Sequence, residues 1–129
     1  MRALLDASAF LWFIGGSDKL SVHAQNVIMD LDNRIVLIMV SLWEIATKVS
    51  LGKLALVKPY EQIIPQQIEE NDIELLPIAH NHLNKIIDLP FHHRDPFDRL
   101  IIAQAMTEGI PIISPDAAFS QYPIKLIWY

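Results

Sequence analysis

Short apolar runs alternate along the chain with longer stretches in which apolar residues recur at helical spacing. Residues 35–40 (IVLIMV) and 110–114 (IPIIS) are nearly continuous apolar runs, which are typical of strands covered on both faces. Residues 2–5 (RALL) predict a third buried strand, and shorter apolar runs at 73–76 and 124–128 predict two more. The pattern is that of a sheet whose strands are separated by helices.

Helices are predicted in the segments between these strands. They are expected at about 7–13, 21–31, 41–52, 59–71, 79–88 and 96–107. Asp95 and Pro96 mark the start of the last one, because aspartate caps a helix and proline suits the first helical position. Gly109 marks its end. Strands that alternate with helices predict one α/β domain, residues 1–129, around a mostly parallel sheet.

Composition narrows the class of protein. The 129 residues are 52% hydrophobic and 19% charged, so we expect a folded domain with a substantial core. The chain has no Cys, which excludes a disulfide scaffold, a thiol nucleophile and a thiolate metal site. No apolar run approaches the ~20 residues that span a bilayer, and Asp6 interrupts the apolar N-terminal stretch. We therefore expect a cytoplasmic protein without a membrane partner or a cleaved signal peptide.

Charge restricts how the protein meets nucleic acid. The net charge is −5, whereas a protein that binds nucleic acid without sequence preference is normally basic. Contact with nucleic acid would therefore need a local cationic patch, or metal ions that offset the acids.

Four acidic residues lie near the carboxyl ends of the predicted strands, where α/β proteins build their sites. Asp6 directly follows the first strand, and Glu44 lies one turn into the helix after the second. Asp116 follows the strand at 110–114, and Asp98 lies in the first turn of the helix that leads into that strand.

Each of these acids also has a structural explanation. Asp6 and Asp116 can cap the helical segments that follow them. Glu44 can complete a capping box with Ser41 and can pair with Lys48 at i+4. The coincidence of four such positions is harder to explain by capping alone.

Convergence of the four carboxylates would imply a metal ion. Like charges held in one crevice repel one another unless a cation neutralises them. Oxygen ligands without Cys or paired His indicate Mg²⁺ or Mn²⁺ rather than Zn²⁺. Ions held by carboxylates commonly serve phosphoryl transfer or phosphodiester cleavage, so the residues predict a site of that kind.

Four blocks of sequence carry a family resemblance that extends over most of the chain. They are LLDASAFLW (4–12), SLWEIATKVSLGKL (41–54), HHRDPFDRLIIAQA (92–105) and IISPDAAF (112–119). They resemble the PIN-domain family, in particular VapC-type toxins of bacterial type II toxin–antitoxin systems. The resemblance implies an α/β/α sandwich with a mainly parallel sheet flanked by helices, and a Mg²⁺- or Mn²⁺-dependent endoribonuclease that holds one or two ions.

The resemblance also implies roles for individual residues. It places the catalytic, metal-binding acids on Asp6, Glu44, Asp98 and Asp116. The family's hydroxyl residues correspond to Ser8 and Ser114, which would orient a carboxylate or a water molecule. Toxin members are typically homodimers that a cognate antitoxin silences by covering the acidic groove.

Two departures from the family pattern stand out. Ala7 lies where many members have Thr, so hydroxyl support near the first aspartate falls to Ser8. Ser114-Pro115-Asp116 replaces a more usual Thr-x-Asp but keeps the hydroxyl and the acid. With all four acids present, we expect an active site.

Cationic residues beside Asp98 are candidates for contact with RNA. His92, His93 and Arg94 can form a rim that meets phosphates, or a solvated loop. Arg99 can contact phosphate or pair with a neighbouring carboxylate.

The remaining histidines and aromatic residues near these motifs have structural explanations. His80 and His82 are spaced to point apart on a helix, so they are predicted to lie on the surface. Trp12, Trp43 and Phe97 are predicted to pack in the core.

The mechanism that follows is attack of an activated water on the scissile phosphorus, with stabilisation of the leaving oxygen by the metal. Three alternatives remain. A haloacid-dehalogenase-type phosphatase also has an aspartate after its first strand, but it needs a second one where this chain has Ser8. A PIN nuclease of RNA processing would share the site, and a non-catalytic PIN module that binds RNA or protein would bind no metal.

Overall fold

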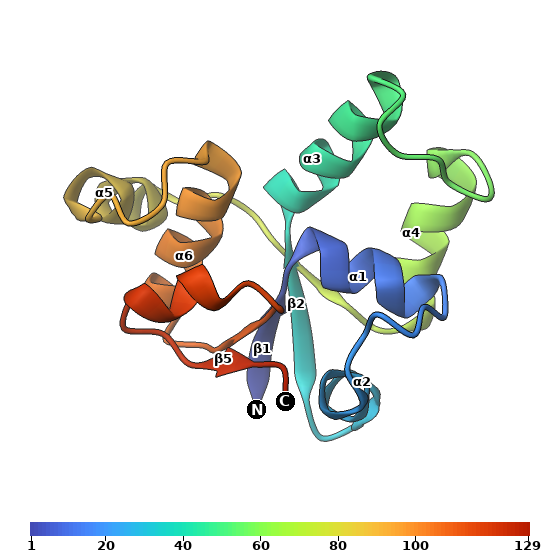
Figure 1. Ribbon diagram of the computed structural model, residues 1–129, viewed down its shortest axis with the longest axis horizontal. Coiled ribbons are helices and arrows are strands. Elements are labelled where there is room, and N and C mark those ends of the chain that lie inside the picture. The colour runs from blue at the N-terminus through green and yellow to red at the C-terminus, as the bar shows by residue number, and fades with distance from the viewer.

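The computed structural model describes residues 1–129, and a five-stranded sheet with the order β3-β2-β1-β4-β5 lies at its centre (Figure 1). The strands are β1 (Arg2–Leu5), β2 (Arg34–Ile38), β3 (Glu74–Leu76), β4 (Ile112–Ile113) and β5 (Leu126–Ile127). Every neighbouring pair is parallel, so all five carboxyl ends lie at the same edge of the sheet.

Helices cover both faces of the sheet. They are α1 (Ala7–Ile14), α2 (Val22–Met29), α3 (Met39–Ser50), α4 (Tyr60–Glu70), α5 (His80–Asp88), α6 (Pro96–Glu108) and the short 3-10 helix η1 (Ala117–Gln121). In Figure 1, α1, α2 and α4 lie on the right, α5 and α6 lie on the left, and α3 rises above the end of β2. The predicted α/β/α arrangement around a parallel sheet is confirmed. No helix combines the length and apolar character needed to cross a bilayer.

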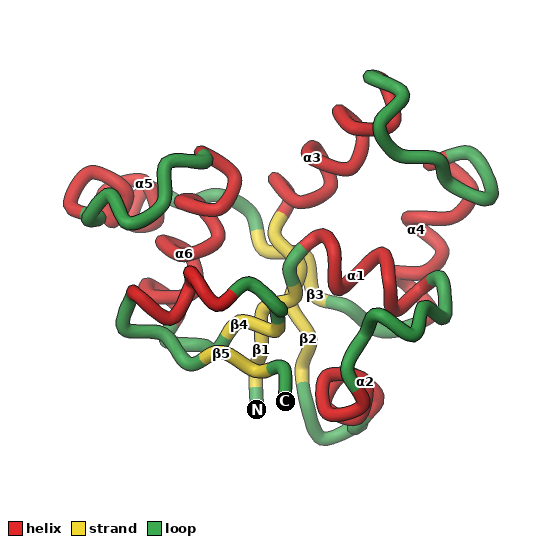
Figure 2. Tube along the Cα trace, in the orientation of Figure 1, coloured by secondary structure: helices red, strands yellow, loops and turns green.

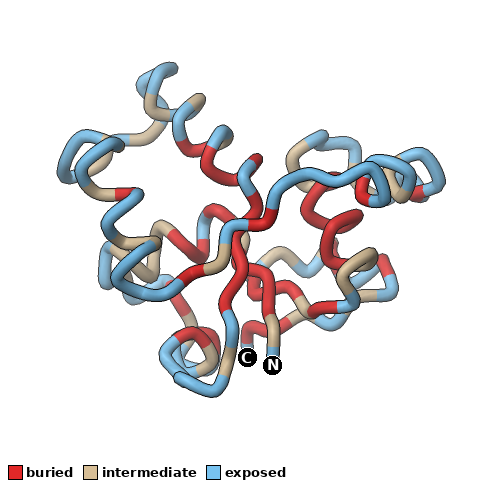
Figure 3. The backbone as a smooth tube through the Cα atoms, turned by 180° about the vertical axis from the view of Figure 1, so that it is seen from behind, coloured by how far each residue is buried: buried red, intermediate tan, exposed pale blue.

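Two hydrophobic clusters occupy the two faces, because successive strand residues point to opposite sides. Leu5, Leu37 and Ile113 pack with the first cluster, under α1, α2 and α4. Leu4 and Ile112 pack with the second, under α6 and η1. Both faces of the strands are therefore buried, as Figure 3 shows for the centre of the molecule, which explains the continuous apolar runs.

The predicted end of the second strand is wrong. The strand ends at Ile38, and the helix begins at Met39 rather than at Ser41. Ser41 is consequently buried inside the first turn of α3, and no side chain caps this helix. The predicted capping box of Ser41 with Glu44 is therefore absent, whereas the ion pair of Glu44 with Lys48 is present at 3.1 Å.

Two side chains lie opposite to where the pattern predicted them. Trp43 is 64% exposed, so its assignment to the core is wrong. His82 is only 2% exposed, so its assignment to the surface is also wrong. The His82 Nδ1 atom accepts the Ala79 N–H at 2.9 Å, and Nε2 lies 2.9 Å from a Glu108 carboxylate oxygen. These contacts hold the start of α5 against the end of α6.

Candidate metal centre

The crevice of this sheet lies beside β1, since the chain continues to β2 on one side of it and reaches β4 on the other. Such a switch point is where parallel α/β sheets form their sites. Asp6 follows β1 directly, and its N–H donates to the Ile113 carbonyl of β4 at 3.3 Å. Figure 2 shows the ends of these strands beneath α1, α3 and α6. The backbone thus places Asp6 at the end of β1, beside the end of β4.

Asp6 both caps a helix and faces the crevice. Its carboxylate accepts the Ala9 N–H at 2.7 Å, which caps α1. Burial raises the pKa of Asp6, and repulsion from Glu44 and Asp116 raises it further. Hydrogen bonds from Ser114 and from Ala9 act in the opposite direction. Asp6 therefore caps α1 and also lies close to the other acids, so helix capping and metal binding can be roles of one side chain.

Glu44 and Asp98 approach the crevice from α3 and α6. The two helices meet where Trp43 packs edge-on against Phe97, with ring centres 5.3 Å apart. Beneath this contact, Asp6, Glu44 and Asp98 line one cleft of about 50 Å³. A single water molecule needs only ~10–15 Å³, so the cleft has room for an ion with water.

The electrostatics of Asp98 reflect this crowding. Its pKa is raised to about 6, first by burial, then by the charge of Asp95, and also by Glu44 and Asp116, whereas His93 lowers it. Asp95 caps α6 by accepting the N–H groups of Phe97 and Asp98, at 2.8 and 3.3 Å, as predicted. The carboxylates are therefore close enough to disfavour one another's charge.

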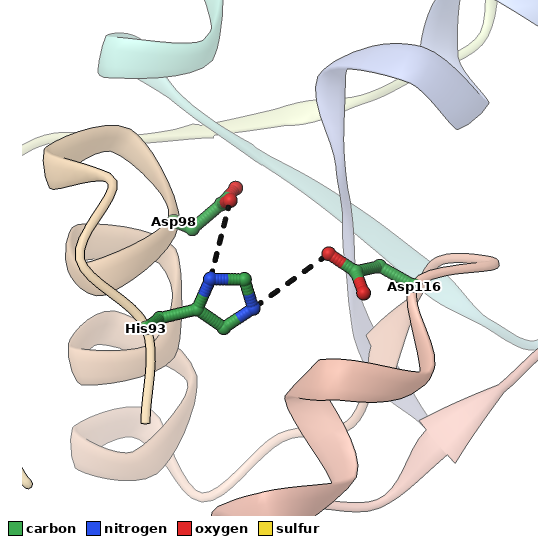
Figure 4. A group of neighbouring side chains, drawn as sticks. All are labelled: His93, Asp98 and Asp116. Carbon is green, nitrogen blue, oxygen red and sulfur yellow. Dashed lines mark ion pairs between the residues drawn. The ribbon is translucent and has the colours of Figure 1, made fainter. Parts of the chain in front are cut away.

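Asp116 lies at the edge of this group rather than in the cleft. It caps η1 by accepting the Ala118 N–H at 3.0 Å, and its side chain is 44% exposed. An Asp116 oxygen lies 3.7 Å from His93 Nε2, and His93 Nδ1 lies 3.7 Å from an Asp98 oxygen (Figure 4). Asp116 is thus linked to Asp98 through the imidazole.

Both serines singled out in the sequence lie beside the acids. Ser8 lines the cleft together with Asp6. Ser114 is fully buried at the end of β4, and its hydroxyl accepts the Asp116 N–H at 3.1 Å while also interacting with Asp6. A hydroxyl in that position can orient the first aspartate.

Arg99 does not reach the crevice. It is only 7% exposed, and its terminal nitrogens donate to four backbone carbonyls. These belong to Ile86, Leu89, Pro90 and His93. Its guanidinium also lies 3.9 Å from the Phe91 ring centre. The prediction that Arg99 contacts phosphate or pairs with a carboxylate is therefore wrong, because the guanidinium is committed to holding the loop before α6. Arg94 is exposed on that loop.

Comparison with known protein families identifies the family of this chain. A model of the PIN domain matches residues 3–125. The chain belongs to the PIN-domain family. PIN domains are generally nucleases that use divalent metal ions. No curated protein matches the sequence.

Solved VapBC structures share the fold over nearly the full chain. VapBC2 from Rickettsia felis, bound to a promoter DNA fragment, is 18% identical with a TM-score of 0.74 and coverage of 100% of both chains. VapBC-5 from Mycobacterium tuberculosis, a toxin–antitoxin family member, is 20% identical with a TM-score of 0.64, covering 99% of this chain and 98% of that one. DNA-bound VapBC from Salmonella typhimurium is 14% identical with a TM-score of 0.69, covering 98% and 97%. At these identities the likeness concerns the fold.

The donor atoms of this PIN domain fit a divalent cation. Carboxylate oxygens are the ligands that Mg²⁺ and Mn²⁺ prefer. The pKa values of Asp6 and Asp98 are both raised by neighbouring acids as well as by burial, and a bound cation would relieve that repulsion.

Proposed function

We propose that this PIN domain is a metal-dependent endoribonuclease that acts in the cytoplasm as the toxin of a type II toxin–antitoxin system. The observation that carries the proposal is the meeting of Asp6, Glu44 and Asp98 in one cleft, with Asp116 beside it. The raised pKa of Asp98, about 6, supports the proposal, because charged carboxylates crowded into one buried cleft cost free energy unless a cation is bound.

In this proposal the four acids hold one or two Mg²⁺ or Mn²⁺ ions. The chemistry that a bound ion supplies is activation of water for attack on phosphorus and stabilisation of charge on the leaving oxygen. Ser114 and Ser8 orient carboxylates, and the Asp6 carboxylate keeps its position because it also caps α1. Arg94, exposed on the neighbouring loop, is available to an RNA phosphate.

A cognate antitoxin is the proposed protein partner. A groove of about 420 Å³ adjoins the acidic cleft, and Ser8 lines both. Its walls are mainly apolar side chains, among them Leu11, Trp12, Leu54, Leu56 and Ile63. An apolar antitoxin segment bound there would reach the edge of the acidic cleft at Ser8, and its continuation past Ser8 would block access of RNA to the acids. A homodimer is proposed from the family resemblance, and the exposed apolar residues Leu83 and Ile87 on α5 offer a surface for it.

Substitution of the acids tests the nuclease. Asp6→Asn and Asp98→Asn keep the side-chain shape but remove the charge, so each should lower Mg²⁺-dependent RNA cleavage by about 100-fold or more. Asp18→Asn, on an exposed loop, is the matched control and should cleave normally. Full cleavage by either site variant would show that the site is wrongly assigned.

Growth experiments and calorimetry separate the remaining alternatives. Expression of the wild type should arrest growth, co-expression of the small upstream reading frame should relieve the arrest, and Asp98→Asn should cause none. Cleavage without growth arrest would indicate a PIN nuclease of RNA processing. Absence of measurable Mg²⁺ or Mn²⁺ binding would indicate a non-catalytic module.

A further inference from the structure

His93 lies between two of the acids and is the one histidine near the crevice. Its Nδ1 atom faces an Asp98 oxygen and its Nε2 atom faces an Asp116 oxygen, both at 3.7 Å (Figure 4). The nitrogen of His93 and the oxygens of the two acids lie within 4.8 Å of one another. An imidazole and two carboxylates are a donor set that divalent metals accept.

The ring nitrogens of His93 make no hydrogen bond. A separation of 3.7 Å exceeds the limit of ~3.2 Å for a nitrogen–oxygen hydrogen bond. The Nε2 atom is also buried and has no hydrogen-bond partner. A buried polar atom left without a partner costs free energy, so its presence calls for an explanation. A metal ion between Nε2 and the Asp116 carboxylate would supply one.

The backbone of His93 is held from both sides, so the position of the ring is not accidental. Its N–H donates to the Tyr122 hydroxyl at 2.9 Å, and that hydroxyl donates to the Pro90 carbonyl at 2.7 Å. Its carbonyl accepts from Arg99 at 3.2 Å, and its ring packs against Phe119 with centres 5.4 Å apart. The buried guanidinium of Arg99 thus finds its role in fixing the loop that presents His93.

The distances between the His93 nitrogens and the carboxylate oxygens that they face agree with a bound ion. Around an octahedral ion with ligands at ~2.1 Å, adjacent ligand atoms lie ~3.0 Å apart and opposite ones ~4.2 Å apart. The two distances of 3.7 Å fall between these limits. Each belongs to a different ring nitrogen, so after small side-chain rotations one nitrogen and the acid that it faces can bind one ion. We propose that His93 is a nitrogen ligand of the metal site, in addition to the four carboxylates. The assignment rests on the proposed metal-dependent function.

A nitrogen ligand changes the expected metal preference. The first-row transition ions bind nitrogen donors more strongly than Mg²⁺ does, whereas carboxylates suit both. Loss of His93 should therefore weaken Mn²⁺ binding more than Mg²⁺ binding. If His93 instead contacted RNA phosphate, its removal would leave both metal affinities unchanged in the absence of RNA.

The test compares His93→Ala with His92→Ala in the full chain. His92 is exposed on the same loop, and its ring packs edge-on against Tyr122 with centres 5.1 Å apart. Titration calorimetry with MnCl₂ should show binding weaker by about tenfold or more in His93→Ala. Mg²⁺ affinity should fall by less than about threefold, and His92→Ala should bind both ions within about twofold of wild type.

Pulsed electron paramagnetic resonance detects a nitrogen ligand of Mn²⁺ directly in the wild type. The test therefore remains decisive even if His93→Ala does not fold. Mn²⁺ bound to the wild type and to His92→Ala should show coupling to an imidazole nitrogen, and His93→Ala should not. Wild type that binds Mn²⁺ without nitrogen coupling would overturn the assignment of His93 while leaving the carboxylate site intact. Wild type that binds neither ion would overturn the proposed function itself, and the assignment with it.

Discussion

Replacing Asp98 with asparagine should stabilise the metal-free protein at alkaline pH. Burial and the neighbouring acids raise the pKa of Asp98 to about 6, so the folded chain holds this proton more tightly than the unfolded chain does. The stability that the protonated group contributes is complete below the unfolded pKa, near 4, and is lost as the pH rises through about 6. Above that pH the charged carboxylate opposes folding, and asparagine removes this cost at almost constant volume.

The size of the expected stabilisation follows from the shift in the pKa of Asp98. A rise of about two pKa units corresponds to ~3 kcal/mol before any discount. Because 34% of the Asp98 side chain is exposed, solvent screens the charge, and we expect a gain of ~1–2 kcal/mol at pH 8. In a domain of this size 1 kcal/mol moves Tm by roughly 3–5 °C, so Tm should rise by about 4–8 °C. At pH 5 the gain should be about half as large.

Thermal unfolding in EDTA, followed by circular dichroism at pH 8 and pH 5, measures the effect. Asp18→Asn should change stability by less than about 0.5 kcal/mol. Saturating Mn²⁺ should reverse the order, since an ion at 100 times its Kd stabilises the wild type by ~2.7 kcal/mol and the variant binds it poorly. A lower Tm for Asp98→Asn at pH 8 in EDTA would refute the electrostatic reasoning.

Four further outcomes are expected. Lowering the pH from 8 to 5 should weaken Mn²⁺ binding by about tenfold, because protons compete for Asp98 below its pKa of about 6; a Kd in calorimetry that is independent of pH would contradict this. Asp95→Ala removes the cap of α6 and should cost ~1 kcal/mol, seen as a lower urea midpoint. Arg99→Met removes the guanidinium from four carbonyls, of which only those of Ile86 and Pro90 keep another donor, and should cost ~3 kcal/mol; an unchanged urea midpoint would exclude its role in the loop. His82→Phe deprives the Ala79 N–H and Glu108 of a partner and should cost ~2 kcal/mol in the same assay, with unchanged Mn²⁺ affinity.

Local sequence patterns were sufficient to predict helix ends and strands whose conformation depends on neighbouring residues alone. Asp95 and Pro96 start α6 as predicted, and Gly109 ends it with a positive φ of 68°. The strands fall within the predicted apolar runs, except that β2 begins one residue earlier, at Arg34, because burial on both faces leaves few polar positions within a strand. The boundary between β2 and α3 was missed because Met39 and Val40 are apolar in either state, so hydrophobicity alone cannot tell a buried strand from a buried first helical turn.

The acids near the strand ends were found from the sequence because parallel strands carry their carboxyl ends to one edge. The order β3-β2-β1-β4-β5 then decides which acids meet. Asp6, Glu44 and Asp98 line the cleft, while Asp116 lies beside it and is linked to Asp98 through His93. No local pattern predicts that link, since it depends on how η1 packs beside the start of α6.

By itself, the sequence determined the alternation of elements, the caps of α1 and α6, and the candidate acids, all of which depend on residues a few positions apart. Only the tertiary structure decided that Arg99 and His82 are buried, that Trp43 is exposed, and that His93 faces two carboxylates. Each of these depends on a partner brought close by packing, such as Glu108 for His82 or Asp116 for His93. The periodicity of a single segment contains no information about such partners.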